Sequence, residues 1–138
     1  MTKVFIDSNI FIRLLTQDDP KKASDCIGFF EAIDLGQLRP YLSNVVILEI
    51  QFVLIRLYKF PKEKVMNDIQ KLLSLRNLTL IEKTNTVAAL SFYKKHNIKY
   101  GDCLIATQIP KGVKLVSYDE EFTKIKIATY TPADFVNH

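Results

Sequence analysis

The chain has 138 residues, and its 48% of apolar side chains can fill the core of a single domain. Charged residues make up 25%, and the formal net charge of +4 favours an anionic partner without requiring one, because lysine-rich surfaces also serve solubility. The richest apolar segment, VVILEIQFVLI, is too short and too polar to cross a bilayer, which excludes a membrane-spanning protein.

The first part of the chain alternates a strand, a helix and a second strand. A strand buried on both faces is predicted over residues 3–6, because the run VFI is uninterrupted and β-favouring. Asp19-Pro20 has the arrangement of a helix N-cap followed by the first helical residue, and Gly36 ends that helix. The next strand is predicted over residues 38–42.

The rest of the chain continues this alternation. Ser43 can cap a helix that runs to about Tyr58, where the segment KFP breaks it, and a further helix runs to about Ser74. The remaining predicted elements are helices from Thr84 to about Lys95 and from Gly101 through Gln108, and strands over residues 78–81, 113–117 and 127–130.

Strands that alternate with helices imply a mostly parallel sheet covered on both faces, so the expected fold class is α/β, a three-layer α/β/α sandwich. Because no repeat, low-complexity tract or Gly/Ser linker interrupts the sequence, residues 1–138 are expected to form one domain. Ligands of parallel sheets gather outside the carboxyl ends of the strands. Asp7 follows the first predicted strand and Asp119 follows the fourth, so both acids are expected to project over the same edge.

Each of these acids also has a purely structural interpretation. Asp7 can cap a helix that begins near Ile10, and Asp119 can cap the segment EEFTK. Asp102, in KYGDCLIA, is a third acid at a predicted helix start. Any one of the three is weak evidence for a functional site.

Glu49 is harder to explain by structure alone. On a helix over residues 44–58, its neighbours at three and four residues' separation are Val45, Val46, Phe52 and Val53. The carboxylate is therefore expected within an apolar stripe, where an unpaired charge is costly and needs a basic partner or a metal ion. The alternative is a helix that is apolar on all faces, with Glu49 marking its solvent-exposed side, although Gln51 fits that side better.

A shared divalent cation would relieve the repulsion among four acids at one edge. Carboxylates that converge raise one another's pKa values. Oxygen ligands without His or Cys favour Mg²⁺ or Mn²⁺, and such an ion activates water and stabilises the charge that develops on a phosphodiester. The residues therefore predict a metal-dependent nuclease, with one or two ions.

Four separated segments resemble the motifs of the PIN-domain ribonucleases, and most closely those of the compact VapC-type toxins of toxin–antitoxin pairs. The segments are VFIDSNIFI, NVVILEIQFVL, YGDCLIA and LVSYDEEF, and the resemblance covers the whole chain. Each motif alone is unspecific, but the four occur in the family's order and at its intervals. The resemblance assigns the catalytic and metal-binding roles to four acids: Asp7, Glu49, Asp102 and Asp119.

The resemblance also implies auxiliary residues around these acids. Ser117 stands where the family more often has Thr, and it keeps the hydroxyl that would hold a metal ligand or a metal-bound water. Glu121 replaces a frequent Asp and is one methylene longer, which leaves a direct role in metal binding open. Asn9 would shape the turn or touch the site, and capping is an equally good interpretation.

RNA needs a cationic path to an acidic site, because carboxylates repel its phosphates. Arg13 and Arg56 are the predicted substrate-binding residues, since they adjoin the first two motifs. In the functional interpretation, one rim of the acidic site is lined by Lys94, Lys95, Lys99 and Tyr100. A solvated helix face explains the lysines equally well, and packing is the simpler role for the tyrosine.

The cysteines and the early sequence bear on cellular location. Cys26 and Cys103 have no nearby Cys or His at metal-ligand spacing, so they are expected to be small buried hydrophobes in a reducing compartment. Asp7 interrupts the early apolar run, so no secretory signal is expected and the predicted location is the cytoplasm.

Taken with the resemblance, these residues predict a Mg²⁺- or Mn²⁺-dependent endoribonuclease that leaves a 5′-phosphate and a 3′-hydroxyl. The resemblance further implies a toxin, an antitoxin that covers the acidic pocket with an Arg among the carboxylates, and a homodimer formed through apolar surface between Asp19 and Tyr58. The alternative is a catalytically inactive PIN-fold module that binds RNA or protein, although such modules usually lack one of the four acids. A receiver-type domain fits less well, since Ser8 and Asn9 rather than a second acid follow Asp7.

Overall fold

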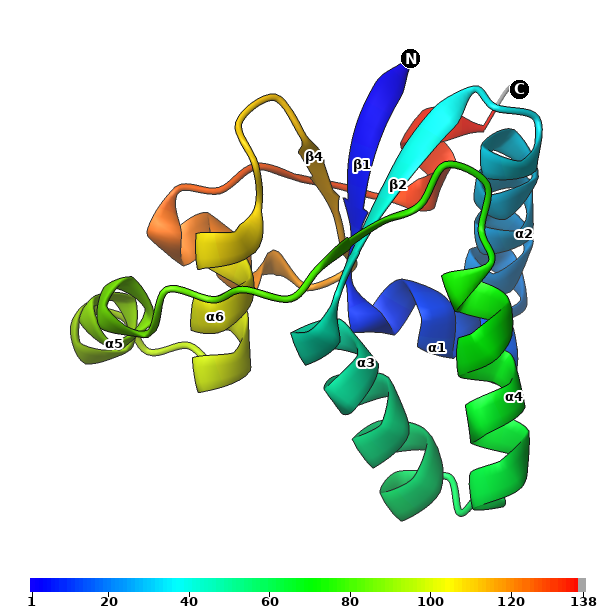
Figure 1. The fold of residues 1–138 in the computed structure, drawn as a ribbon, viewed down its shortest axis with the longest axis horizontal. Coiled ribbons are helices and arrows are strands. Elements are labelled where there is room, and N and C mark those ends of the chain that lie inside the picture. Colours follow the sequence, from blue (N-terminus) through cyan, green and yellow to red (C-terminus); the bar gives the residue numbers. More distant parts are fainter. Residues whose placement is uncertain (137–138) are drawn as a thin grey trace.

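A five-stranded sheet forms the centre of the computed structural model, which describes residues 1–136 (Figure 1). The strand order is β3-β2-β1-β4-β5, and every neighbouring pair is parallel. The strands are β1 Thr2–Ile6, β2 Leu38–Ser43, β3 Thr79–Ile81, β4 Lys114–Val116 and β5 Thr129–Tyr130. The predicted α/β class and the five predicted strands are confirmed, although the last strand is shorter than residues 127–130.

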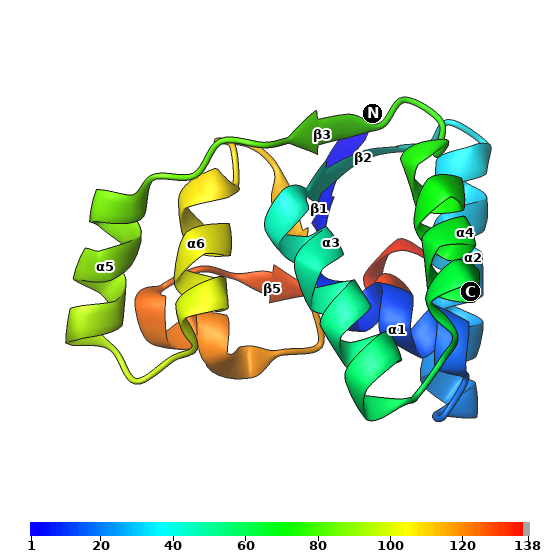
Figure 2. The same ribbon diagram turned by 60° about the horizontal axis from the view of Figure 1, so that its bottom comes forward.

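Helices cover both sides of this sheet. α1, α2 and α4 lie on one side and α5 and α6 on the other, while α3 and η1 extend beyond the end of β2 (Figures 1 and 2). The α-helices are α1 Ser8–Thr16, α2 Pro20–Asp34, α3 Asn44–Gln51, α4 Lys62–Leu73, α5 Thr86–Lys95 and α6 Tyr100–Gln108. The other helical segments are the π-helix η1 Phe52–Leu57 and the 3₁₀-helices η2 Glu120–Ile125 and η3 Pro132–Phe135.

Polar side chains cap several helices at the predicted places. Asp7, Asp19 and Ser43 accept hydrogen bonds from backbone N–H groups of the turns they cap, at 2.8, 3.1 and 3.0 Å. The expected cap at Thr84 is wrong by one residue. Asn85 caps α5 instead, and its Oδ1 accepts from a backbone N–H three residues on, at 3.0 Å.

The helix predicted over residues 44–58 changes its character partway. α3 ends at Gln51 and the chain continues as the π-helix η1. The Tyr58 N–H donates to the carbonyl of Val53, five residues back, at 3.1 Å. Such wider turns occur often near functional sites. This one begins three residues after Glu49.

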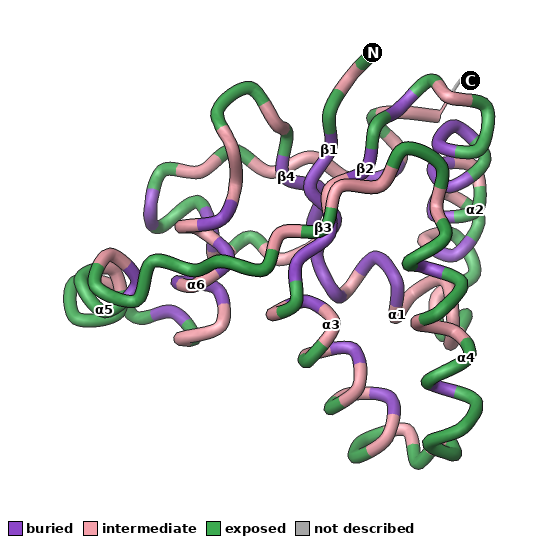
Figure 3. The backbone as a smooth tube through the Cα atoms, viewed as in Figure 1, coloured by how far each residue is buried: buried purple, intermediate pink, exposed green. Residues whose placement is uncertain are grey.

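The core is built around β1, whose residues 4–6 are completely buried between the helical layers (Figure 3). Cys26 and Cys103 are free and buried, as predicted. Within the described residues, no helix is long and apolar enough to cross a membrane.

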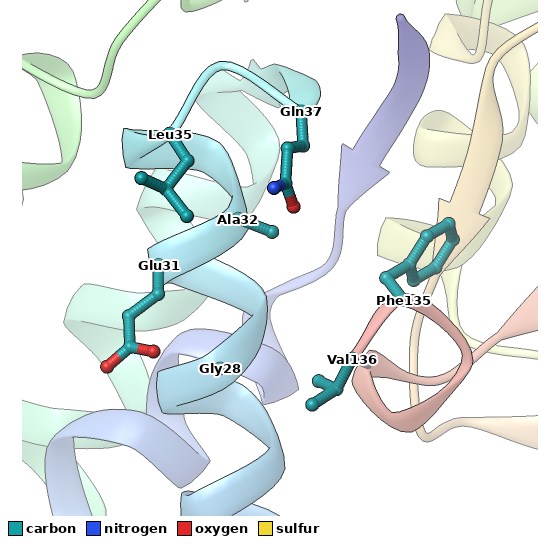
Figure 4. Close-up of a pocket in the computed structure, with 7 residues that line it drawn as sticks. All are labelled: Gly28, Glu31, Ala32, Leu35, Gln37, Phe135 and Val136. Carbon is teal, nitrogen blue, oxygen red and sulfur yellow. The ribbon is translucent and has the colours of Figure 1, made fainter. Parts of the chain in front are cut away.

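The segment after β5 packs against α2. The rings of Phe29 and Phe135 meet with centroids 5.7 Å apart, and a hollow of about 190 Å³ remains between α2 and η3 (Figure 4). A Cβ at Gly28 would lie 3.1 Å from the side chain of Val136, so this contact requires a glycine-sized residue or a shift of the valine. None of the four predicted site acids lines this hollow.

Candidate active site at the carboxyl edge of the sheet

Asp7 lies at the carboxyl end of β1 and is only 2% exposed. Its backbone N–H donates to the carbonyl of Val116 at the end of β4, at 3.0 Å. Its Oδ1 accepts from the Ser8 N–H, and its Oδ2 accepts from the Ser117 hydroxyl at 2.6 Å and from the Asn9 amide at 3.3 Å. One carboxylate therefore caps α1 and also faces the end of β4.

Ser117 and Asn9 join the end of β1 to the end of β4. The Ser117 hydroxyl donates to Asp7 and accepts from the Asp119 N–H at 2.9 Å and from the Asn9 amide at 3.1 Å, which uses its full hydrogen-bonding capacity. Asn9 Oδ1 accepts from the Tyr118 N–H at 3.0 Å. Asp119 Oδ1 caps η2 by accepting from the N–H two residues on. Two loops that are distant in sequence are thus held in one arrangement.

Glu49 and Asp102 approach the same edge from helices. Asp102, in the first turn of α6, is 1% exposed, and Glu49 on α3 is half-buried. A Cβ added at Gly101 would lie 3.7 Å from Cδ and Oε2 of Glu49, an ordinary van der Waals distance, so the start of α6 lies directly beside this carboxylate. Glu49 Oε1 and Asp102 Oδ2 are buried and have no hydrogen-bond partner within residues 1–136. Buried oxygens of this kind are costly unless an ion or a water satisfies them.

The helix face around Glu49 differs from the prediction. Val46, Ile50 and Leu54 form the fully buried face, whereas Phe52 is 59% exposed. The physical reason is that α3 and η1 extend past the sheet, so the outer side of this helix has no layer to pack against (Figure 1). Glu49 therefore lies at the border between the core and an exposed apolar surface, not inside a buried stripe.

Burial raises the pKa values of Asp7, Glu49 and Asp102, and for the last two the pKa reaches about 7. The other acids raise these pKa values further, and Asp119 contributes in all three cases. Hydrogen bonds to the charged form, from Ser117 above all, oppose the shift at Asp7. The four acids therefore lie within one another's electric fields.

The donor set at this edge fits a hard divalent cation. The four acids offer only oxygen, the ligand type of Mg²⁺ and Mn²⁺, and two buried oxygens lack a partner among the described residues. Within residues 1–136, however, no three His, Cys, Asp or Glu side chains already stand as a metal-binding group. The acids share a field without forming a cage, so their side chains would have to rotate to ligate one ion. The metal-binding role stays a prediction.

Lys99, the residue before α6, is the cation that acts on this cluster. The acids together raise its pKa although burial lowers it, and its charge lowers the pKa values of Asp7, Glu49 and Asp102. Its signal in the sequence is its place directly before the motif YGDCLIA, three residues before Asp102. A solvated helix face explained that place equally well, so the sequence did not single it out.

The predicted basic residues do not join the acids in the same way. Arg13 on α1 and Arg56 in η1 are not among the charges that shift the pKa values of the three buried acids. Glu121, predicted as an auxiliary acid, forms an ion pair with Lys124 at 2.7 Å, and its side chain is 43% exposed. The structure thus brings together the four acids and Lys99, and it leaves both arginines outside this cluster.

The sequence matches the PIN domain family model over residues 4–128. A VapC ribonuclease of Aquifex aeolicus (strain VF5) is 23% identical over 129 residues, which cover 92% of this chain and 95% of that protein. VapBC2 from Rickettsia felis, solved bound to a DNA fragment from their promoter, aligns with a TM-score of 0.66 and 18% identity over 94% of this chain and 98% of that chain. PAE2754 from Pyrobaculum aerophilum aligns with a TM-score of 0.63 and 16% identity over 93% of this chain and 83% of that chain. At these identities the structural matches show the fold alone.

Proposed function

The chain belongs to the PIN-domain family, and we propose that it is a VapC-type endoribonuclease that hydrolyses RNA phosphodiester bonds with Mg²⁺ or Mn²⁺. The observation that carries this proposal is the meeting of four acids from separate segments, two of them with a buried oxygen that lacks a partner in residues 1–136. A purely structural role is a poor explanation, because mutually repelling buried carboxylates reduce stability.

In this proposal the cation is held by Asp7, Glu49, Asp102 and Asp119. When bound, it supplies Lewis acidity to the phosphate and lowers the pKa of a water. The hydrogen bond from Ser117 keeps Asp7 in one orientation. Glu49 and Asp102, with pKa values of about 7, must lose any bound proton to act as ligands, so cation binding is expected to weaken below about pH 7.

The proposed reaction is an in-line hydrolysis. Water adds to the scissile phosphorus opposite the 3′-oxygen, the bond from phosphorus to that oxygen breaks, and the leaving oxygen takes a proton. The products carry a 5′-phosphate and a 3′-hydroxyl. The attacking water loses its proton to solvent, because the proposal assigns all four carboxylates of this edge to the cation.

We also propose an antitoxin partner and a homodimer. VapBC2 of Rickettsia felis, which shares this fold, was solved as a complex, and an antitoxin segment would cover the acidic edge here with a basic side chain among the carboxylates. Apolar side chains between Asp19 and Tyr58 remain exposed, including Leu35 at 68% and Leu57 at 66%. The mass of the purified chain in solution, measured by light scattering, tests the dimer.

The activity is tested by digestion of labelled RNA with Mg²⁺, with a chelator, and with the Asp7→Asn variant. Asp34→Asn, at an exposed position on α2, is the matched control. We expect the wild type and the control to cleave RNA in Mg²⁺ and not in chelator, and we expect Asp7→Asn to cleave in neither condition. Cleavage that ignores both the chelator and Asp7→Asn would overturn the mechanism. RNA binding without cleavage would favour the inactive binding module. That alternative is also favoured by a second observation: within residues 1–136, no three His, Cys, Asp or Glu side chains form a preorganised metal-binding group.

A further inference from the structure

Lys99 lies between two hollows of the surface. The first has a volume of about 460 Å³ and is lined by Leu48, Glu49, Phe52, Val53 and Lys99. The second also measures about 460 Å³ and is lined by Tyr93, Asn97, Ile98, Lys99 and Glu121. The first adjoins α3 and the second adjoins α5, and α6 lies between these two helices (Figures 1 and 2).

Each hollow has one exposed aromatic ring in its wall. Phe52 is 59% exposed, which is unusual because phenylalanine is among the residues most often buried. Tyr93 is 52% exposed, and its ring is held edge-on against Tyr100 with centroids 5.5 Å apart. Exposed rings held in a hollow offer a flat face to a partner that stacks.

The lysine supplies the charge between these rings. Lys99 is the wall that the two hollows share, and the electric fields of all four site acids reach it. A polymer that carries a phosphate and an aromatic base in every repeating unit matches this alternation of aromatic, cationic and aromatic surface. Duplex RNA does not match, because its base faces are hidden in the stack.

We propose that the two hollows form one groove for single-stranded RNA, in which one base stacks on Phe52, another stacks on Tyr93, and Lys99 contacts a phosphate between them. This inference rests on the proposed function and adds the residues that hold the strand on either side of the reacting edge. It also explains why η1 exposes an aromatic side chain, Phe52, to solvent instead of a polar one.

The test is direct binding of a fluorescein-labelled single strand of about ten nucleotides, followed by anisotropy in the presence of a chelator. The variants are Phe52→Ala, Tyr93→Ala and Lys99→Gln. Their matched controls are Leu73→Ala, Leu90→Ala and Lys95→Gln, at exposed positions that line neither hollow. Melting curves check that every variant is folded.

We expect each aromatic substitution to weaken binding by about 5-fold or more, and the conservative variants Phe52→Trp and Tyr93→Phe to restore it. Lys99→Gln should reduce the slope of log affinity against log salt by about 0.7, the share of one phosphate contact on a single strand. Equal binding by variants and controls overturns the groove. So does tighter binding of a duplex, or no binding by the wild-type chain, because these three contacts need no metal.

The cleavage assay separates this inference from the proposed function. A chain that cuts RNA while all three variants bind and cut like the wild type is a nuclease without this groove. A chain that cuts no RNA but loses single-strand binding in all three variants has the groove without the nuclease. The two proposals therefore fail on different readouts.

Discussion

The two sides of the acidic edge are built in different ways. On the strand side, Asp7, Asn9, Ser117 and Asp119 satisfy one another through hydrogen bonds of 2.6 to 3.3 Å. On the helix side, Glu49 and Asp102 each keep a buried oxygen without a partner in residues 1–136, and their pKa values rise to about 7. The strand side has its hydrogen bonds once the chain folds, whereas the helix side keeps two buried oxygens that the proposed cation would satisfy.

The two sides have different tasks: the strand side positions a carboxylate, and the helix side contributes charge for binding. The sheet fixes the strand side, because the Asp7 N–H donates to Val116 and the Ser117 N–H donates to Tyr130. The helix side contributes charge whose burial costs stability until something neutralises it. In the proposed metal site, the strand side would orient one ligand and the helix side would supply charge that the cation neutralises.

The largest expected effect comes from removing charge on the helix side. We expect Asp102→Asn to reduce the rate of RNA cleavage in Mg²⁺ by about 10²-fold or more, because an electrostatic stabiliser is lost. In chelator above about pH 7, the same substitution should raise the melting temperature, since it removes a repelled, buried charge. Cleavage of labelled RNA and thermal melting measure the two effects.

The Asp102→Asn variant tests the comparison between the two sides, because it is expected to lower the cleavage rate and to raise the melting temperature in chelator. Mg²⁺ should raise the melting temperature of the wild type and of the control Asp34→Asn, and it should have little effect on Asp102→Asn. If Asp102→Asn melts lower in chelator and still responds to Mg²⁺ like the wild type, the helix side is not a strained cation site.

A smaller effect is expected from breaking the strand side. Ser117→Ala removes the donor to Asp7 and leaves the Asp119 N–H and the Asn9 amide without their acceptor. We expect a loss of about 2 kcal/mol in the free energy of unfolding, because these groups are buried and one of them is charged. Urea denaturation measures it.

Ser117→Thr and Ser91→Ala are the matched comparisons for that loss. Threonine keeps the hydroxyl and should restore most of the stability, while the exposed Ser91 on α5 should change it by no more than about 0.5 kcal/mol. A Ser117→Ala protein as stable as the Ser91→Ala control would show that the strand side is no more preorganised than the surface.

The pH dependence of stability should be confined to one window. Glu49 has its pKa raised from 4.5 and Asp102 from 3.8, both to about 7, so the folded chain holds these protons to higher pH than the unfolded chain. Their contribution to stability is therefore present below about pH 4 and is lost as pH rises through about 7. In chelator, the melting temperature should fall across this window, and in Mg²⁺ the fall should shrink. A melting temperature in chelator that rises across the window would contradict these pKa shifts.

Much of the strand side was predictable because its signals are local. A carboxylate directly after a buried strand is expected at the carboxyl edge of the sheet, and it is also a good helix cap. Asp7 directly follows β1, Asp119 follows the end of β4 by three residues, and the structure confirms both caps. The cap of α5 was missed by one residue, because Thr84 and Asn85 are both capping types and only packing decides between them.

The helix side was less predictable because its features depend on tertiary contacts. Nothing in the segment NVVILEIQFVL announces the π-helical turn after Gln51, or that Phe52 remains in water. Glu121 fits its motif, but its ion pair with Lys124 depends on side-chain rotamers that the sequence does not determine. The position of Lys99 among the acids likewise depends on how α6 packs beside α3.

The smallest expected effect concerns Lys99, the built-in cation of the helix side. In chelator at low salt, Lys99→Gln should lower the free energy of unfolding by no more than about 0.5 kcal/mol, because the side chain is exposed and its interaction with the acids is screened by solvent. The loss should fade as salt is added, and Lys95→Gln should show none. Titration calorimetry should find that Lys99→Gln binds Mg²⁺ more tightly than the wild type, since a fixed positive charge opposes a second one in the same field. Weaker Mg²⁺ binding by Lys99→Gln would mean that the lysine arranges the carboxylates instead of competing for them, and the helix side would then be preorganised like the strand side.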